Sequence, residues 1–176
     1  MTDQDPDNRL VRAYNEMMQG IREAFDIADT ETSDISLTQA LQHARDRVIE
    51  IGELTVEESE QISSFIKRDI NDAAEYLMEA SAEFSEWLML DIEVVERKIV
   101  DLFLSVADKT KLELDHLQQT NRAQSVYFSG EVTGPGTLEC INCGAHAAYT
   151  TTSTIHRCQE CNGTEFKRAV VKRLPE

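Results

Sequence analysis

The sequence predicts a mostly α protein in which an antiparallel helical bundle or coiled-coil-like arm is followed by a small C-terminal β module. Two observations carry this prediction. Apolar residues recur every three or four positions through most of residues 8–121, which is the period of a helix. From Val126 onward the chain is rich in strand and turn formers, and all four cysteines lie there in two Cys-x-x-Cys pairs. We therefore expect a helical domain over residues 1–125 and a separate β domain over residues 126–176.

The first helix is expected over residues 8–29. Its apolar residues alternate in steps of three and four, as in a coiled-coil seam. Tyr14, Met17 and Met18 on this seam are expected to pack against other apolar side chains rather than to form a ligand site. The preceding residues 1–7 are polar and acidic, and we expect them to be disordered.

Two capping boxes mark the next helix starts. Ser36 with Gln39, and Thr55 with Glu58, have the spacing at which a side chain and a backbone amide satisfy each other at a helix N-terminus. Gly52 is placed to end the helix that begins after Ser36.

The apolar period then continues over residues 56–107 without a glycine or proline. This length fits one long coiled-coil helix or two helices, and a break is expected near residues 87–90, where apolar residues crowd every face. Residues 108–111 interrupt the period, and a last helical segment is expected to end near Asn121. Because a helix with one apolar stripe needs a partner, we expect a bundle within the chain, or a homodimer through the same seam.

The strongest chemical signal is the cysteine arrangement, with 14 residues between the two pairs. Four thiolates on two facing turns form the tetrahedral S4 cage that Zn²⁺ prefers, and a gap of about 15 to 20 residues is typical of such sites. Gly144, Asn162 and Gly163 follow the pairs and tolerate the left-handed backbone of a metal-binding turn. The candidate ligands of one structural zinc ion are Cys140, Cys143, Cys158 and Cys161.

Disulfides, redox chemistry and iron are the alternative uses of four cysteines. Two disulfides need an oxidising compartment, to which nothing in the sequence points. A redox dithiol usually opens a helix after a strand, whereas both pairs lie among turn and strand formers. Iron also forms S4 sites, and the sequence does not separate it from zinc. Since cysteines fill all four positions, no place remains for a catalytic water, and the metal is expected to be structural.

The β module is predicted to be a zinc ribbon, whose small core depends on the metal for stability. Strands are expected at residues 126–128, 137–139, 147–152, 154–157 and 165–171. The two strands that lie between the cysteine pairs are expected to form a hairpin. Residues 130–136 contain three glycines and a proline, and we expect turns there.

The net charge of −16 is unevenly distributed. Residues 1–125 carry 12 basic and 28 acidic side chains, whereas residues 126–176 carry five of each. The acidic part would repel nucleic acid and anionic membranes. No apolar stretch approaches the roughly 18 residues that a membrane span needs, so we expect a cytoplasmic protein without membrane contact.

Three segments together resemble the YbeL-like family of bacterial zinc-ribbon-containing proteins: Arg47–Thr55, Asp108–Thr110 and Tyr127–Cys140. The most specific part is the Ser-Gly-Glu-Val sequence before the first cysteine pair. The resemblance implies the same architecture, a cytoplasmic location and zinc held by the four cysteines, but no reaction, because the family is one of unknown function.

No catalytic motif appears, and we expect that the protein is not an enzyme. Glu113 and His116 have the spacing of a di-iron carboxylate site, but a second such pair is missing from the sequence. His146 and His156 lie near the cysteines and are expected on the ribbon surface, since four thiolates already complete a zinc site.

We expect a non-enzymatic module that contacts an unidentified protein partner. One alternative is a ribbon associated with nucleic acid in transcription or translation, with Tyr149 and Phe166 as stacking faces, although direct nucleic-acid binding is disfavoured by the acidic helices. A second alternative is a thiol/zinc redox switch. The basic residues available to nucleic acid would be Arg157, Lys167, Arg168, Lys172 and Arg173.

Overall fold

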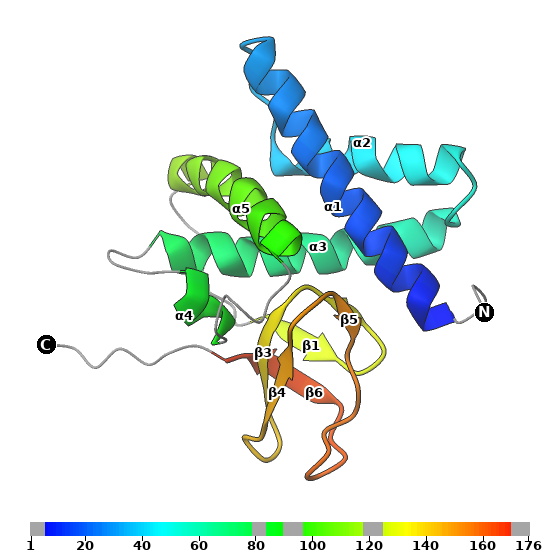
Figure 1. The fold of residues 1–176 in the computed structure, drawn as a ribbon, viewed down its shortest axis with the longest axis vertical. Coiled ribbons are helices and arrows are strands. Elements are labelled where there is room, and N and C mark those ends of the chain that lie inside the picture. Colours follow the sequence, from blue (N-terminus) through cyan, green and yellow to red (C-terminus); the bar gives the residue numbers. More distant parts are fainter. Residues whose placement is uncertain (1–5, 79–83, 90–96, 118–124, 170–176) are drawn as a thin grey trace, which may run out of the picture.

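The computed structural model describes residues 6–78, 84–89, 97–117 and 125–169. The helices are α1 (Pro6–Thr30), α2 (Leu37–Glu50), α3 (Val56–Leu77), α4 (Phe84–Leu88) and α5 (Arg97–Leu117). The strands are β1 (Val126–Phe128), β2 (Val132–Thr133), β3 (Gly136–Cys140), β4 (His146–Tyr149), β5 (Ser153–Thr154) and β6 (Glu165–Arg168). Figure 1 shows α1 crossing α2 and α3, α5 crossing α3, and the small β module lying against one side of these helices, which confirms the predicted fold class. None of the described helices is long and apolar enough to cross a membrane.

Both predicted capping boxes are present. The amide of Gln39 donates to Ser36 Oγ at 3.1 Å before α2, and the amide of Glu58 donates to Thr55 Oγ1 at 3.2 Å before α3. Gly52 has a φ of +74° directly after α2, as a helix-ending glycine requires. The first helix begins at Pro6, two residues before the start expected from the apolar period.

The long apolar run of residues 56–107 contains more than one helix in the part of it that the structure describes. It is divided among α3, α4 and α5, and α4 ends beside Met89, whose φ of +50° breaks the helix in the region where a break was expected. The end of α3 at Leu77 was not predicted.

The interruption expected at residues 108–111 was wrong, since α5 continues through it to Leu117. Two contacts accommodate the polar residues there. Thr110 Oγ1 donates to the carbonyl of Val106 at 2.9 Å, and Lys109 forms an ion pair with Asp29 at the end of α1. The helix end expected near Asn121 lies outside the described residues.

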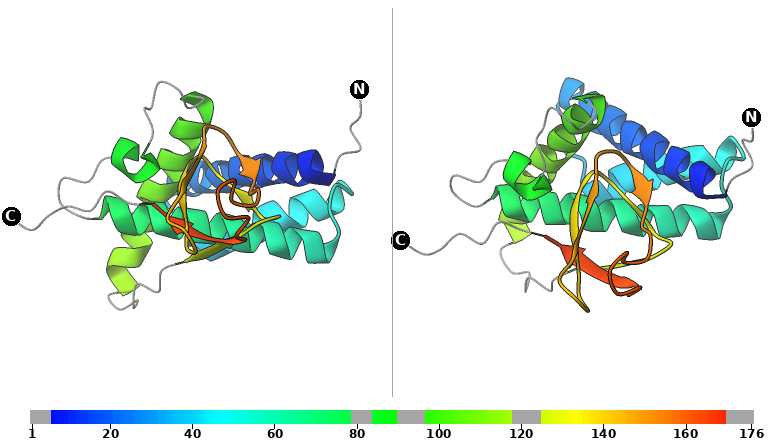
Figure 2. Two further views of the ribbon diagram at one scale, coloured as in Figure 1. Left: turned by 90° about the horizontal axis from the view of Figure 1, so that it is seen from below. Right: turned by 60° about the horizontal axis from the view of Figure 1, so that its bottom comes forward.

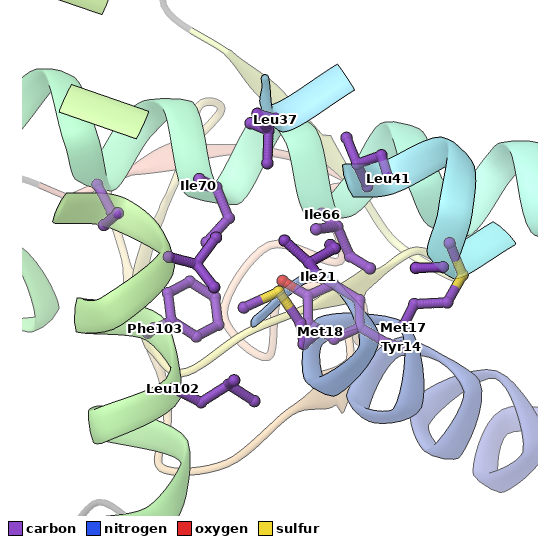
Figure 3. Close-up of a cluster of buried hydrophobic side chains, with 14 of the residues drawn as sticks. Tyr14, Met17, Met18, Ile21, Leu37, Leu41, Ile66, Ile70, Leu102 and Phe103 are labelled. Atoms are coloured by element: carbon purple, nitrogen blue, oxygen red, sulfur yellow. The ribbon is translucent and has the colours of Figure 1, made fainter. Parts of the chain in front are cut away.

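The helical core is formed mainly by α1, α2, α3 and α5 (Figure 3). Tyr14, Met17 and Met18 are buried in it, which confirms that they pack against apolar neighbours. Trp87 of α4 extends this core, with its ring 5.4 Å from that of Phe84 and 6.0 Å from that of Phe103. The labelled members in Figure 3 are Tyr14, Met17, Met18, Ile21, Leu37, Leu41, Ile66, Ile70, Leu102 and Phe103.

The strands form a four-stranded antiparallel sheet in the order β1-β6-β3-β4, and β2 pairs separately with β5. Phe166 on β6 faces Tyr127 on one side and Cys140 on the other. The views of Figures 1 and 2 agree that the strands lie beside α3. Contacts of β2 with α1 and α3, of β5 with α1, and of β3 with α4 join the two parts.

The hairpin predicted between the cysteine pairs is not formed. Instead β4 pairs with β3 across the first cysteine turn, and β5 pairs with β2, a strand that lies where only turns were expected. One reason is the hydrogen bond from Thr152 Oγ1 to Asn15 Oδ1 at 2.6 Å, which holds the chain after β4 against α1. Another is Val132 of β2, whose side chain is fully buried in the helical core.

Candidate metal centre

The fold brings all four cysteines together at one end of the sheet. Their sulfur atoms lie within 4.8 Å of one another, and two pairs are 3.6 Å apart, Cys140 with Cys161 and Cys143 with Cys158. Four sulfurs at about 2.3 Å from one tetrahedral zinc ion would be separated by about 3.8 Å. The cluster therefore has the donor set and the size that a zinc ion requires.

The two Cys-x-x-Cys turns have closely similar backbone geometry. The amide of Gly144 donates to the carbonyl of Cys140 at 2.8 Å, and the amide of Asn162 donates to the carbonyl of Cys158 at 2.9 Å. Gly144 and Asn162 have φ values of +75° and +60°, as the sequence predicted for residues after a metal-binding pair.

Gly163 is required for a different reason. A Cβ atom at this position would lie 3.1 Å from Cys161 Sγ and 3.3 Å from Cys140 Sγ, so a side chain would press on two candidate ligands. The same residue donates its amide to Cys161 Sγ at 3.4 Å. An N–H donor aimed at sulfur stabilises the thiolate, which is the form that binds metal.

The thiols have unequal acidities in the cluster. Hydrogen bonds from Asn142 and from the Gly163 amide lower the pKa of Cys161 to about 6. For Cys143, the backbone of Ala145 acts in the same direction, but hydrogen bonds to the other thiols and desolvation outweigh it and raise the pKa to about 12. Since thiolates are the ligands, metal binding at this cluster would release protons.

Among the described residues, the atoms placed to hold a metal ion at this site are the four cysteine sulfurs. Cys140 and Cys158 are buried, Cys161 is half-buried and Cys143 is exposed, so the cluster opens to solvent on the side of Cys143. His146 is exposed and its Nε2 lies 3.9 Å from a carboxylate oxygen of Glu139.

A second polar cluster, which the sequence pattern did not predict, lies where the ribbon meets the helices. Asp69 of α3 is fully buried. Its carboxylate accepts a hydrogen bond from Tyr14 at 2.7 Å, from the Gly134 amide at 2.8 Å and from Arg68 Nε at 3.0 Å. Burial, followed by the nearby carboxylate, raises the pKa of Tyr14, so its phenol remains a donor.

Arg168, at the end of β6, is the ribbon's main contribution to this cluster. It is 5% exposed, and its guanidinium carbon lies 4.5 Å from the ring centre of Trp87 and 4.9 Å from that of Tyr127. Its Nη2 donates to the Tyr127 hydroxyl at 3.2 Å and lies 3.8 Å from the Asp69 carboxylate. Burial lowers the pKa of Arg168, but Tyr127 and Asp69 outweigh burial and raise it, so this buried arginine stays charged.

Arg68 completes the contact from the helical side. Its guanidinium carbon lies 3.8 Å from the ring centre of Tyr127, and its Nη2 donates to the Val132 carbonyl at 3.2 Å. The same guanidinium pairs with Glu131, whose carboxylate also accepts the Phe128 amide at 3.1 Å. We name Asp69, Arg68, Tyr127, Glu131 and Arg168 the interface cluster.

The position of Asp69 in the sequence indicates that its carboxylate is buried. Asp69 follows Ile66 by three positions and precedes Ile70, so a carboxylate lies on the apolar stripe of α3. A charged residue on a buried stripe needs a partner of opposite charge. Its distant partner was not predictable, because the spacing of apolar residues does not show that Arg168 of the ribbon lies against α3.

These contacts correct the predicted nucleic-acid surface, because part of it is not exposed. Arg168 is buried at the interface, Phe166 is buried in the ribbon core, and Lys167 pairs with Glu139 at 3.1 Å. Among the other residues that were expected to contact nucleic acid, Arg157 is exposed and Tyr149 is half-buried. Lys172 and Arg173 lie outside the described residues, as do the side chains of Glu113 and His116.

Comparison with known proteins agrees with this geometry. A family model described as a zinc-ribbon containing domain matches residues 26–170. The "Uncharacterized protein YbeL" of Escherichia coli strain K12 is 27% identical over 161 residues, which are 92% of this chain and 96% of that protein. The protein of the same name from the O157:H7 strain has the same identity and coverage. No solved structure matches the chain significantly.

Proposed function

The chain belongs to the family of proteins with a zinc-ribbon containing domain, and from this premise we propose a non-enzymatic, zinc-stabilised interaction module. In this proposal Cys140, Cys143, Cys158 and Cys161 bind one structural Zn²⁺. The metal-held ribbon then presents the outer face of its sheet to a protein partner.

The donor set supports a structural rather than a catalytic metal. Four thiolates saturate a tetrahedral zinc ion and leave no coordination position for water or substrate. Zinc would supply the stability that the small ribbon core, centred on Tyr127, Leu138 and Phe166, does not provide alone. A cytoplasmic location, where thiols stay reduced, suits such a site.

The observation that carries the interaction proposal is a group of exposed apolar residues on one face of the ribbon. Val126 and Phe128 are 40% and 43% exposed on β1, and Ile141 is 48% exposed beside the first metal turn. Phe128 is the register partner of Glu165, and Ile141 donates its amide to the carbonyl of the same residue. We name Val126, Phe128 and Ile141 the ribbon face.

The ribbon face has the character of an interaction surface. Tyr127 and Phe166 point inward to the ribbon core, so the alternating residues on both strands point outward. Clustered exposed apolar side chains with a polar surround mark protein contact sites more often than scattered ones. The charged pair of Lys167 and Glu139 provides part of that surround. Ile141 lies between two candidate ligands, which connects the shape of this face to metal binding.

Serine substitution on the ribbon face tests the proposal. Phe128→Ser and Ile141→Ser should each reduce recovery of a specific protein partner by about tenfold, because truncation of an anchor side chain commonly costs more than 1 kcal/mol of binding. The measurement is quantitative mass spectrometry of proteins captured from native lysate on immobilised wild type and variants.

The matched control is Ile51→Ser, an isoleucine 60% exposed at the end of α2. Each variant should keep the wild-type zinc content by elemental analysis, so that a loss of partner reports on the surface. Equal recovery of the partner by wild type and both ribbon variants would contradict the proposal.

A further inference from the structure

A hollow of about 480 Å³ lies between the C-terminal half of α1, the linker after it and one side of α2. Figure 1 shows this linker returning from the end of α1 to the start of α2, at the end of the molecule away from the strands. The hollow is therefore separate from the metal centre and from the ribbon face.

Small side chains create the space. The two helices touch where Gly20 meets Ala44, since a Cβ on Gly20 would lie 3.2 Å from the Cβ of Ala44. Beyond this crossing α1 contributes Ala24 and Ala28 to the lining, and their short side chains leave space between the helices. Ile27, 58% exposed, forms part of an apolar rim. A hollow of this size accepts one large aromatic or aliphatic side chain.

The lining is acidic as well as apolar. It carries three carboxylates, on Glu23, Glu31 and Asp34, against the one guanidinium of Arg47, with His43 beside them. Arg47 Nη1 binds the carboxylate of Glu23 at 2.8 Å, and this hydrogen bond lowers the pKa of Glu23. Glu31 and Asp34 are both exposed at the mouth of the hollow.

We propose that this hollow binds a basic peptide segment of a partner protein through one large apolar anchor side chain flanked by lysine or arginine. The apolar floor selects the anchor, and the exposed carboxylates at the mouth select the flanking cations. The net charge of −16 would steer a basic segment toward the protein and repel an acidic one. This site does not depend on the ribbon face, so a partner could contact either surface or both.

Fluorescence anisotropy with three dye-labelled synthetic peptides tests the proposal. The first carries lysines around a central tryptophan, the second replaces the tryptophan with serine, and the third replaces the lysines with glutamates. The first should bind wild-type protein, and each of the others should bind at least about tenfold more weakly. Absence of binding by the first peptide, or equal binding by the second, would overturn the proposal.

Two variants test the place of binding. Ala24→Phe fills the hollow, and the double variant Glu31→Lys/Asp34→Lys reverses the charge at its mouth without altering the core. Each variant should bind the first peptide about tenfold more weakly than the wild type does. The control Glu50→Lys/Glu57→Lys makes the same change in net charge at exposed positions outside the lining and should leave affinity within about twofold.

The remaining outcomes separate peptide binding in the hollow from attraction to overall charge and from dimerisation. Equal weakening by the control would show attraction to overall charge and overturn the proposal. A wild-type dimer in sedimentation that Ala24→Phe dissociates would show that a second copy occupies the hollow, which also overturns it. If the Ile141→Ser variant still binds the first peptide, the hollow is a site distinct from the ribbon face. If this variant no longer binds the peptide, the two surfaces are not independent, which would contradict the proposal.

Discussion

Replacement of Asp69 with asparagine is expected to lower the free energy of unfolding by about 3 kcal/mol, because it removes the carboxylate that pairs with the buried Arg168 and one of the two that pair with Arg68. Asparagine has nearly the same shape, so the change removes charge with little change in packing. Arg68 and Arg168 both lie close to this carboxylate, at 3.0 Å and 3.8 Å. Urea denaturation followed by circular dichroism measures the effect.

The control for Asp69 is Asp46→Asn, on the exposed face of α2, which should change stability by less than about 0.5 kcal/mol. A double-mutant cycle with Arg168→Met isolates the coupling between the two parts of the protein. The double variant should be more stable than the sum of the single effects predicts, since a charge is no longer left alone. Additive effects would contradict the assignment of Asp69 and Arg168 to one cluster.

Metal removal is expected to lower the stability of the protein more than Asp69→Asn does. Chelation of zinc, or the double substitution Cys140→Ser/Cys158→Ser, should lower the melting temperature by at least about 10 °C, because the metal contributes several kcal/mol to a small ribbon. Differential scanning calorimetry with parallel elemental analysis measures both stability and metal content. About one zinc per chain is expected in the wild type.

Histidine variants provide the control for metal removal. His146→Ser and His156→Ser change potential ligands near the cysteines that do not belong to the sulfur cluster. Both should retain one zinc per chain and the wild-type melting temperature. Loss of zinc from either variant would show a mixed ligand set, and iron in place of zinc in the purified protein would correct the identity of the metal.

Signals that act within a few residues were predictable from the sequence. The capping boxes at Ser36 and Thr55 each need only a hydroxyl and a partner three residues later, and both were found. The cysteine turns need two thiols and a residue that accepts positive φ, and the structure brings the four sulfurs together. In each case the interaction that fixes the local conformation is encoded within the segment itself.

Features that depend on distant segments were not predictable in the same way. Ser153 and Thr154 pair with β2 rather than with β4, because a contact from Thr152 to α1 holds the intervening chain. Arg168 was predicted to belong to a basic surface, but Trp87 and Asp69, distant in sequence, provide a buried site for it. A pattern of apolar spacing does not show which charged residues will meet across an interface.

We expect that a metal-held ribbon and the helices stabilise each other through the interface cluster. Hydrogen–deuterium exchange of zinc-loaded and chelated protein tests it most directly. Chelation should accelerate amide exchange in residues 126–140 and also in α3 around Asp69, while α2, which does not contribute to the cluster, remains protected. Accelerated exchange in the ribbon with no change in α3 would contradict the claim, because the two parts would then be stable independently of each other.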